Sequence, residues 1–212
     1  MNCSLNCFCD FLQAPTSERK RNIVRRYKDS RSGEAKGRST HYQPVLNAIK
    51  GTLCPGGNAE QKIAAIAKAC IRPTSTDRLN QGRIESNLAV FHAFRSIFGS
   101  ADLKTFPSPR MQFLAGPDVA INVQPDLYFE AHGIKMMVKL GISKKKRSEQ
   151  LVRMMIQMLY RGVRGKALGL PIESLFFIDV RAGKTYSESA VNKSLESELE
   201  PTVKELKKLW TE

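Results

Sequence analysis

The sequence predicts a protein of the α/β (α+β) class, in which helices flank a mixed β-sheet and a helical region comes first. Apolar residues recur at helical spacing in residues 43–71 and again in residues 83–98. Runs rich in β-branched and aromatic residues follow between residues 111 and 142, and a helical pattern returns at residue 148. With 42% hydrophobic and 25% charged residues among 212, the composition is globular and the chain can form a sizeable core.

Three regions are expected along the chain. Residues 1–80 form a basic, mainly helical N-terminal region, residues 81–190 form the core with the sheet, and residues 191–212 form a C-terminal helix. In the first region, Ser and Thr caps with an early acid predict a short basic helix over residues 16–28. Two more helices are expected there, over residues 43–50 and 58–71, because the breaker sequence C-P-G-G separates them.

In the core region, the expected order of elements is a helix, strands, a second helix and further strands. Its elements are predicted to be a helix over 83–98, a strand over 111–114, a long hairpin over 119–142, a helix over 148–161, and short strands over 175–180 and 184–187. The tail carries apolar residues at helical spacing around Leu195, Val203, Leu206 and Leu209, which indicates an amphipathic helix.

The hairpin separates two kinds of side chain. His132-Gly133 is interpreted as its two-residue turn, which places Asp126 directly across from Lys139. One face is wholly apolar and predicted to be core; it collects Leu127, Phe129, Ala131, Ile134, Met136, Val138 and Leu140. The other face collects Asp126, Tyr128, Glu130, Lys135, Met137 and Lys139. Taken alone, the Asp126–Lys139 pair has the simpler interpretation of a cross-strand ion pair that contributes under about 1 kcal/mol.

The sequence P-D at Asp126, a short hairpin, Lys139 and a following helix together resemble the PD-(D/E)xK superfamily of metal-dependent nucleases. The helix carries Gln157-Met158-Leu159-Tyr160, similar to the Q-x-x-Y of the exonuclease-like branch, and Glu85 lies on the preceding helix, where many members supply an acid. The resemblance implies a restriction-endonuclease-like core and Mg²⁺ or Mn²⁺ as cofactor. Asp126 would hold the metal, Lys139 would position the attacking water, and Gln157 would orient the site.

One position departs from that pattern. The acid expected two residues before Lys139 is Met137, which cannot bind Mg²⁺. Either the site is inactive or the acid comes from elsewhere. Glu149 is one candidate, on the polar stripe of the following helix, although an acid there equally suits a helix N-terminus. Glu85 is another, and Glu130 is a weaker substitute.

Positive charge is concentrated in two segments. The formal net charge is +14, and residues 17–38 carry +6 and residues 135–166 carry +9 of the balance. Such segments suit a polyanion, and nucleic acid is favoured over membrane, with DNA favoured over RNA. The predicted backbone-binding residues are Lys144, Lys145, Lys146, Arg147 and Arg153 in one segment and Arg19, Lys20, Arg21, Arg25 and Arg26 in the other.

The remaining features indicate a soluble, intracellular protein, assigned to the cytoplasm. No stretch approaches 18 uncharged apolar residues, and the five cysteines are expected to be thiols. The first hypothesis is a Mg²⁺-dependent phosphodiesterase, and the second is the same fold kept as a non-catalytic nucleic-acid-binding or assembly module. A third is an interaction protein whose basic segments bind an acidic protein partner. A protein partner or a homodimer is compatible with any of these hypotheses.

Overall fold

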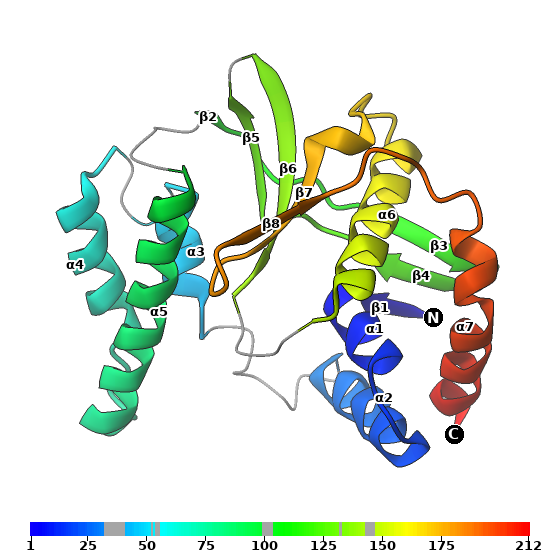
Figure 1. The fold of residues 1–212 in the computed structure, drawn as a ribbon. Helices are drawn as coiled ribbons and strands as arrows, with labels where there is room; N and C mark the ends of the chain where they lie inside the picture. The colour runs from blue at the N-terminus through cyan, green and yellow to red at the C-terminus, as the bar shows by residue number, and fades with distance from the viewer. Residues whose placement is uncertain (32–40, 52, 54–55, 99–103, 132, 143–146) are drawn as a thin grey trace.

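The computed structural model describes residues 1–31, 41–51, 53, 56–98, 104–131, 133–142 and 147–212. Helices and strands alternate through these residues and build two separate sheets, so the structure confirms the mixed α+β class (Figure 1). The helices are α1 (Leu5–Leu12), α2 (Ser17–Arg31), α3 (Gln43–Ile49), α4 (Ala59–Cys70), α5 (Asp77–Phe98), α6 (Glu149–Gly165) and α7 (Leu195–Thr211). The strands are β1 (Asn2–Ser4), β2 (Lys104–Thr105), β3 (Gln112–Gly116), β4 (Val119–Asn122), β5 (Leu127–Ala131), β6 (Ile134–Gly141), β7 (Leu175–Asp179) and β8 (Lys184–Ser187).

The larger sheet has the strand order β2-β5-β6-β7-β8 and is mixed. Strands β5 and β6 pair antiparallel in the predicted register, with Leu127 opposite Val138 and Glu130 opposite Lys135. Gly133 has a φ of 77° beside the turn, which is the left-handed conformation that glycine tolerates best. Strands β6 and β7 are parallel, and α6 makes the crossover between them.

The smaller sheet corrects the prediction of one long hairpin over residues 119–142. Val119–Asn122 is β4, which pairs with β3 on one side and with β1 on the other. Strand β1 begins at Asn2 and pairs in parallel with β4, more than a hundred residues away in the sequence. Three residues are too few to show a hydrophobic period, so the sequence carried no signal for this strand.

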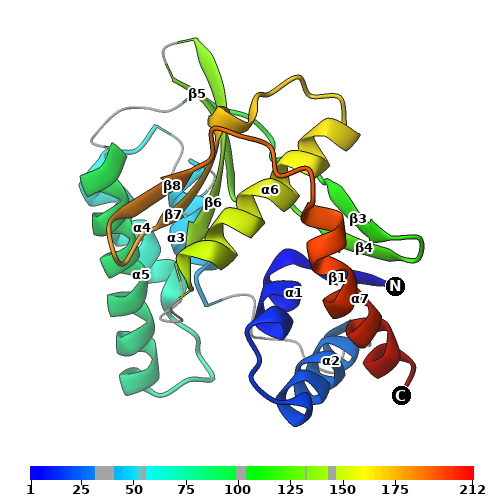
Figure 2. The ribbon, with the colours of Figure 1, turned by 45° about the vertical axis from the view of Figure 1, so that its right-hand side comes forward.

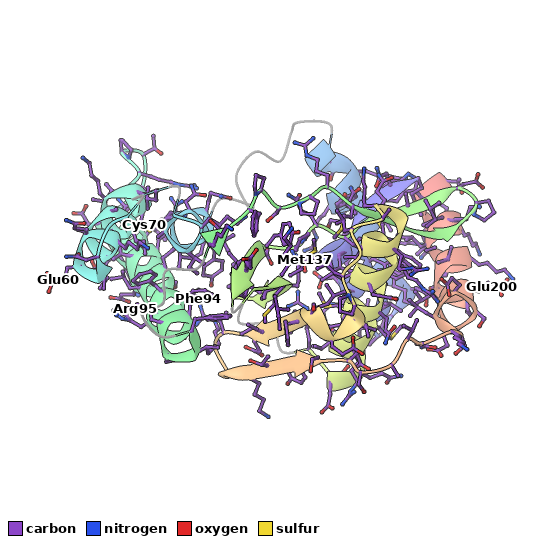
Figure 3. All side chains as sticks on the ribbon, turned by 90° about the horizontal axis from the view of Figure 1, so that it is seen from above. Glu60, Cys70, Phe94, Arg95, Met137 and Glu200 are labelled. Atoms are coloured by element: carbon purple, nitrogen blue, oxygen red, sulfur yellow. The ribbon has the colours of Figure 1, made fainter. Side chains whose placement is uncertain are left out.

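Both faces of the larger sheet are buried, by different helices. Helices α3, α4 and α5 cover the face that carries Leu127, Phe129 and Val138, which confirms that part of this face as core (Figure 1). The prediction was wrong for Ile134, which follows the turn at the end of the hairpin and is 55% exposed. The opposite face carries Met137 into a second core with α1, α6 and α7 and the smaller sheet (Figure 2). Met137 is fully buried near the centre of the molecule (Figure 3). The hairpin face that the sequence presented as polar is therefore partly core.

The N-terminal helices divide between these two cores. Helix α1 and helix α2 pack with α7 and the smaller sheet, whereas α3 and α4 pack against α5 on the other side of the larger sheet (Figure 1). Helix α5 begins at Asp77, earlier than predicted, because the Thr76 hydroxyl accepts a hydrogen bond from Leu79 N at 3.4 Å. No helix in the described ranges is both long and apolar enough to cross a membrane.

Candidate active site

Asp126 and Lys139 meet where β5 begins and β6 approaches its end. The Lys139 ammonium lies 3.1 Å from the Asp126 carboxylate and donates a second hydrogen bond, of 3.2 Å, to the carbonyl oxygen of Gln124. The other carboxylate oxygen accepts the backbone N–H of Leu140 at 2.8 Å. The two side chains are only 21% and 13% exposed, so the sheet holds the pair in one geometry. The predicted pairing across the hairpin is thus present as a direct contact.

Helix α1 lies beside this pair, which the sequence did not indicate. Arg147, just before α6, donates to the Asn6 side chain at 3.2 Å, and its guanidinium lies 5.8 Å from the centre of the Phe177 ring. Burial raises the pKa of the nearby Cys9 thiol to about 12, while the positive charges of Arg147 and Lys139 act in the opposite direction. Arg147 and Lys139 therefore both act on the Cys9 thiol of α1, as does the carboxylate of Asp10 on the same helix.

The position of Met137 makes the departure from the family pattern structural as well as chemical. Its side chain has no exposed surface and packs in the second core, between the strands that carry Tyr128 and Leu175. A carboxylate there would be buried in apolar surroundings unless a cation shared the space. The residue fills the core and supplies no ligand.

The other predicted acids are held by different partners. Glu149 accepts two hydrogen bonds from Arg153, the shorter of 2.8 Å, and its side chain is 62% exposed. Glu85 accepts from Gln81 on the same helix at 3.1 Å. Glu130 lies 3.9 Å from Lys104 on β2. No contact in the described structure joins any of them to Asp126.

Gln157 is the predicted orienting residue, and it binds backbone instead. It is buried, donates to the Ala190 carbonyl at 2.8 Å and accepts from Asn192 N at 3.0 Å. These bonds attach the segment before α7 to α6. The side chain has both of its polar ends satisfied by backbone, so its contacts are those of a structural residue.

These residues, as arranged, do not fit Mg²⁺ or Mn²⁺. Hard divalent cations need several oxygen ligands, and Asp126 is the one carboxylate at this position among the described residues. Both of its oxygens already accept bonds from Lys139 and Leu140. No group of three or more His, Cys, Asp or Glu side chains elsewhere in the described ranges is placed to hold a metal ion.

Apart from Arg147, which contacts Asn6, the predicted phosphate-binding residues fall into three groups. Lys144, Lys145 and Lys146 lie outside the described residues. Three others form ion pairs within the molecule. Arg153 pairs with Glu149 and Glu188, Lys20 pairs with Glu205, and Arg21 pairs with Glu212. Arg19, Arg25 and Arg26 are exposed along α2. The acidic residues of α7 thus neutralise part of the basic helix beside it.

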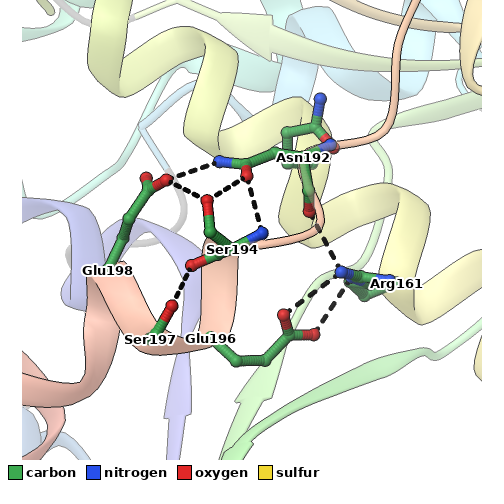
Figure 4. A network of polar contacts seen from close by, with 7 residues as sticks. Arg161, Asn192, Ser194, Glu196, Ser197 and Glu198 are labelled. Carbon is green, nitrogen blue, oxygen red and sulfur yellow. Dashed lines mark hydrogen bonds and ion pairs between the residues drawn. The ribbon is translucent and has the colours of Figure 1, made fainter.

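A cavity that sequence reasoning missed lies between α6 and β3. Its volume is about 650 Å³, and its lining includes Arg110, Gln112, Leu114, Arg161, Lys166 and Glu196. Arg161 is already held, because its guanidinium pairs with Glu196 at 3.1 Å and donates to the Asn192 carbonyl at 3.0 Å (Figure 4). No residue predicted for the site lies in this lining, and its members share no sequence motif that could have indicated it.

No family model matches the sequence, and no curated protein matches it significantly. The arguments for function therefore come from the chain's own residues and from the resemblance of its hairpin.

Proposed function

We propose that this chain is a nucleic-acid-binding protein with a PD-(D/E)xK-like core, in which Lys139 and its surroundings contact the phosphate backbone. The observation that carries the proposal is the convergence of Asp126 and Lys139 at 3.1 Å from adjacent strands. Arg147 adds a second cation close by, and the segment that joins β6 to α6 contains three consecutive lysines. The element order α5, strands, α6, β7 agrees with the order on which the resemblance rests.

A non-catalytic role is the form of this function that the geometry supports best. Met137 is part of the core, and the Asp126 carboxylate is engaged by Lys139 and by Leu140 N–H. In this role Lys139 and Arg147 supply positive charge to phosphate, while Asp126 fixes the direction of the Lys139 side chain. Such contacts position a protein on nucleic acid without reading its sequence.

Phosphodiester hydrolysis with Mg²⁺ is the second candidate, which rests on the family resemblance alone. A carboxylate and an ammonium on neighbouring strands are what the resemblance assigns to metal binding and water positioning. This candidate requires a second acid, for which Glu149 and Glu85 are the residues predicted from the sequence. Each has another partner in the described structure, so hydrolysis requires at least one of them to exchange that partner.

One experiment separates the candidates. Single- and double-stranded DNA and RNA are incubated with the protein, with Mg²⁺, with Mn²⁺ or with a chelator, and both binding and cleavage are recorded. Binding in chelator without cleavage in metal supports the non-catalytic role. Metal-dependent cleavage that Asp126→Asn abolishes supports hydrolysis. Absence of binding to all four substrates at low salt overturns both.

The substitutions remove charge and keep a hydrogen-bonding group at each position. Asp126→Asn retains a side-chain oxygen for the Leu140 N–H, and Lys139→Gln retains a donor for the Gln124 carbonyl. Lys204→Gln removes one lysine that pairs only with its helix neighbour Glu200 and serves as the control for loss of bulk charge. We expect Lys139→Gln to weaken binding and Lys204→Gln to leave it unchanged.

A further inference from the structure

Phe106 is an aromatic residue that belongs to neither core. It follows β2 and is half-buried, yet it packs in neither hydrophobic cluster of the described structure. Its ring partner is Tyr128, with centroids 5.1 Å apart and planes at 42°. Its backbone N–H donates to the Tyr128 carbonyl at 2.8 Å, so the edge of the sheet fixes its position. Core packing does not account for an aromatic ring at this edge.

Two ammonium groups lie next to this ring. Lys104 Nζ is 5.6 Å and Lys135 Nζ is 5.5 Å from the Phe106 centroid, within the range of a cation–π contact. Both lysines are exposed, and Glu130 lies 3.9 Å from Lys104 and opposite Lys135. The exposed lysines therefore place positive charge beside the half-buried Phe106, while Tyr128 is half-buried and also packs against the core around α6.

The register places this cluster beside the candidate site. Tyr128 lies on β5 two residues after Asp126, which immediately precedes the strand, so the two are about 7 Å apart along the chain. On β6, Lys135 and Lys139 lie opposite Glu130 and Asp126, on the face of the sheet that carries Tyr128. The aromatic pair and the two lysines thus lie at one end of this face and the Asp126–Lys139 pair at the other, with the buried Met137, opposite Tyr128, between Lys135 and Lys139 on β6.

We propose that Phe106 and Tyr128 form a stacking surface for an unpaired nucleobase, with Lys104 and Lys135 contacting its backbone. Proteins that bind single strands combine aromatic faces with cations in this way, because every base has a face to stack and every linkage a charge. The proposal rests on the proposed function and narrows it to single-stranded or locally unpaired nucleic acid. In duplex the bases are already stacked on each other, so an aromatic surface gains little there.

The test compares a ligand that has bases with one that lacks them. Affinity is measured in chelator, so that no cleavage occurs, for oligothymidine, for oligouridine and for an abasic DNA strand of the same length. Phe106→Leu and Tyr128→Leu remove one ring each and keep an apolar side chain. Tyr186→Leu is the matched control, because Tyr186 is a half-buried aromatic residue at the opposite edge of the sheet.

We expect Phe106→Leu and Tyr128→Leu each to weaken oligothymidine binding about tenfold, which is in the range for loss of one stacked base. Their affinity for the abasic strand and for duplex should equal that of wild type, and Tyr186→Leu should change none of the affinities. The stacking surface is overturned if the variants lose as much affinity for the abasic strand as for oligothymidine. It is also overturned if both folded variants keep wild-type affinity for oligothymidine and for oligouridine. If the stacking surface is overturned but the wild-type protein still binds the abasic strand, the proposed function is retained.

Wild-type protein that binds none of these ligands overturns the proposed function as well. The comparison of oligothymidine with oligouridine also distinguishes DNA from RNA as the ligand. A loss on oligothymidine alone assigns the surface to DNA, and a loss on oligouridine alone assigns it to RNA. Circular dichroism confirms that each variant is folded before its affinity is used.

Discussion

The Asp126 carboxylate is held by two groups that come from the same stretch of β6. Lys139 contributes its ammonium and Leu140 its backbone N–H, and both depend on the register of the hairpin. Charge-assisted hydrogen bonds of this kind are shorter and stronger than neutral ones. Replacement of the Asp126 or Lys139 side chain therefore affects both the local structure and any phosphate contact. Amide variants are the informative ones because they keep a hydrogen-bonding group in place.

Residue patterns predicted this pair well and its surroundings poorly. A glycine turn between alternating runs fixes every cross-strand neighbour, so Asp126 opposite Lys139 followed from spacing alone. The same alternation could not show what covers each face. Met137 looked like one member of a polar face, but α6 and its neighbours bury that part of the strand. The contacts of Gln157 and Glu149 with the segment before α7 and with Arg153 also depend on tertiary packing.

Cys9 supplies a prediction at the scale of one residue. Burial raises its pKa to about 12 from an ordinary value of 9.0, so the folded protein keeps the thiol protonated where the unfolded chain loses the proton. Between pH 9 and 12 the native state binds more protons, and the free energy of unfolding therefore falls as the pH rises. We expect Cys9 to contribute about 1.4 kcal/mol of this loss per pH unit within that window.

Urea unfolding of wild type and Cys9→Ala at several pH values from 7.5 to 10.5 checks this. Cys9→Ala is less stable at pH 7.5 because it leaves a small cavity, and the relevant quantity is the slope above pH 9. That slope should be shallower in the variant. Parallel curves for the two proteins over the whole range would contradict the assignment.

At the scale of elements, long periodic segments were predictable and short ones were not. Helices α2, α3, α4 and α6 lie within a few residues of their predicted bounds, since caps and apolar periods mark them. The strand β1 and helix α1 lie in a cysteine-rich stretch of a dozen residues, and their structure depends on pairing with β4. The smaller sheet is therefore a product of contacts between distant segments, which local pattern does not encode.

The contact between α6 and the smaller sheet gives a prediction at this scale. Gly162 faces Met111 and Val123, and an added Cβ would lie 2.4 Å from Val123 Cγ2 and 3.2 Å from Met111 Cβ. A buried β-branched side chain has little freedom to move away. We expect Gly162→Ala to destabilise the protein by about 1–3 kcal/mol, despite the better helix propensity of alanine.

Gly82 in α5 is the matched control for this substitution. A Cβ there meets nothing within 4 Å, so Gly82→Ala should stabilise the protein by up to about 1 kcal/mol through helix propensity alone. Thermal or urea unfolding of both variants measures the difference. A Gly162→Ala protein as stable as Gly82→Ala would show that α6 does not pack closely on the smaller sheet.

For the whole molecule, fewer of the basic side chains behind the net charge of +14 are free to contact a polyanion than their distribution along the sequence suggested. Ion pairs from α7 engage Lys20 and Arg21 of α2, and Arg153 and Arg161 on α6 are paired with nearby acids. Lys104, Lys135 and Lys139 lie on one face of the larger sheet with Phe106 and Tyr128, and two of them are also paired, Lys139 with Asp126 and Lys104 with Glu130. The proposed function therefore has nucleic acid contact this face first, with a secondary part for the N-terminal basic helix.

The most direct test of this placement is the salt dependence of nucleic-acid affinity in wild type, Lys139→Gln and the control Lys204→Gln. Each phosphate contact contributes about 0.9 for duplex DNA, or about 0.7 for a single strand, to the slope of log affinity against log salt concentration. The account predicts that Lys139→Gln lowers the steepness by roughly one such contact, while Lys204→Gln keeps the wild-type slope. Identical slopes for wild type and Lys139→Gln would contradict it.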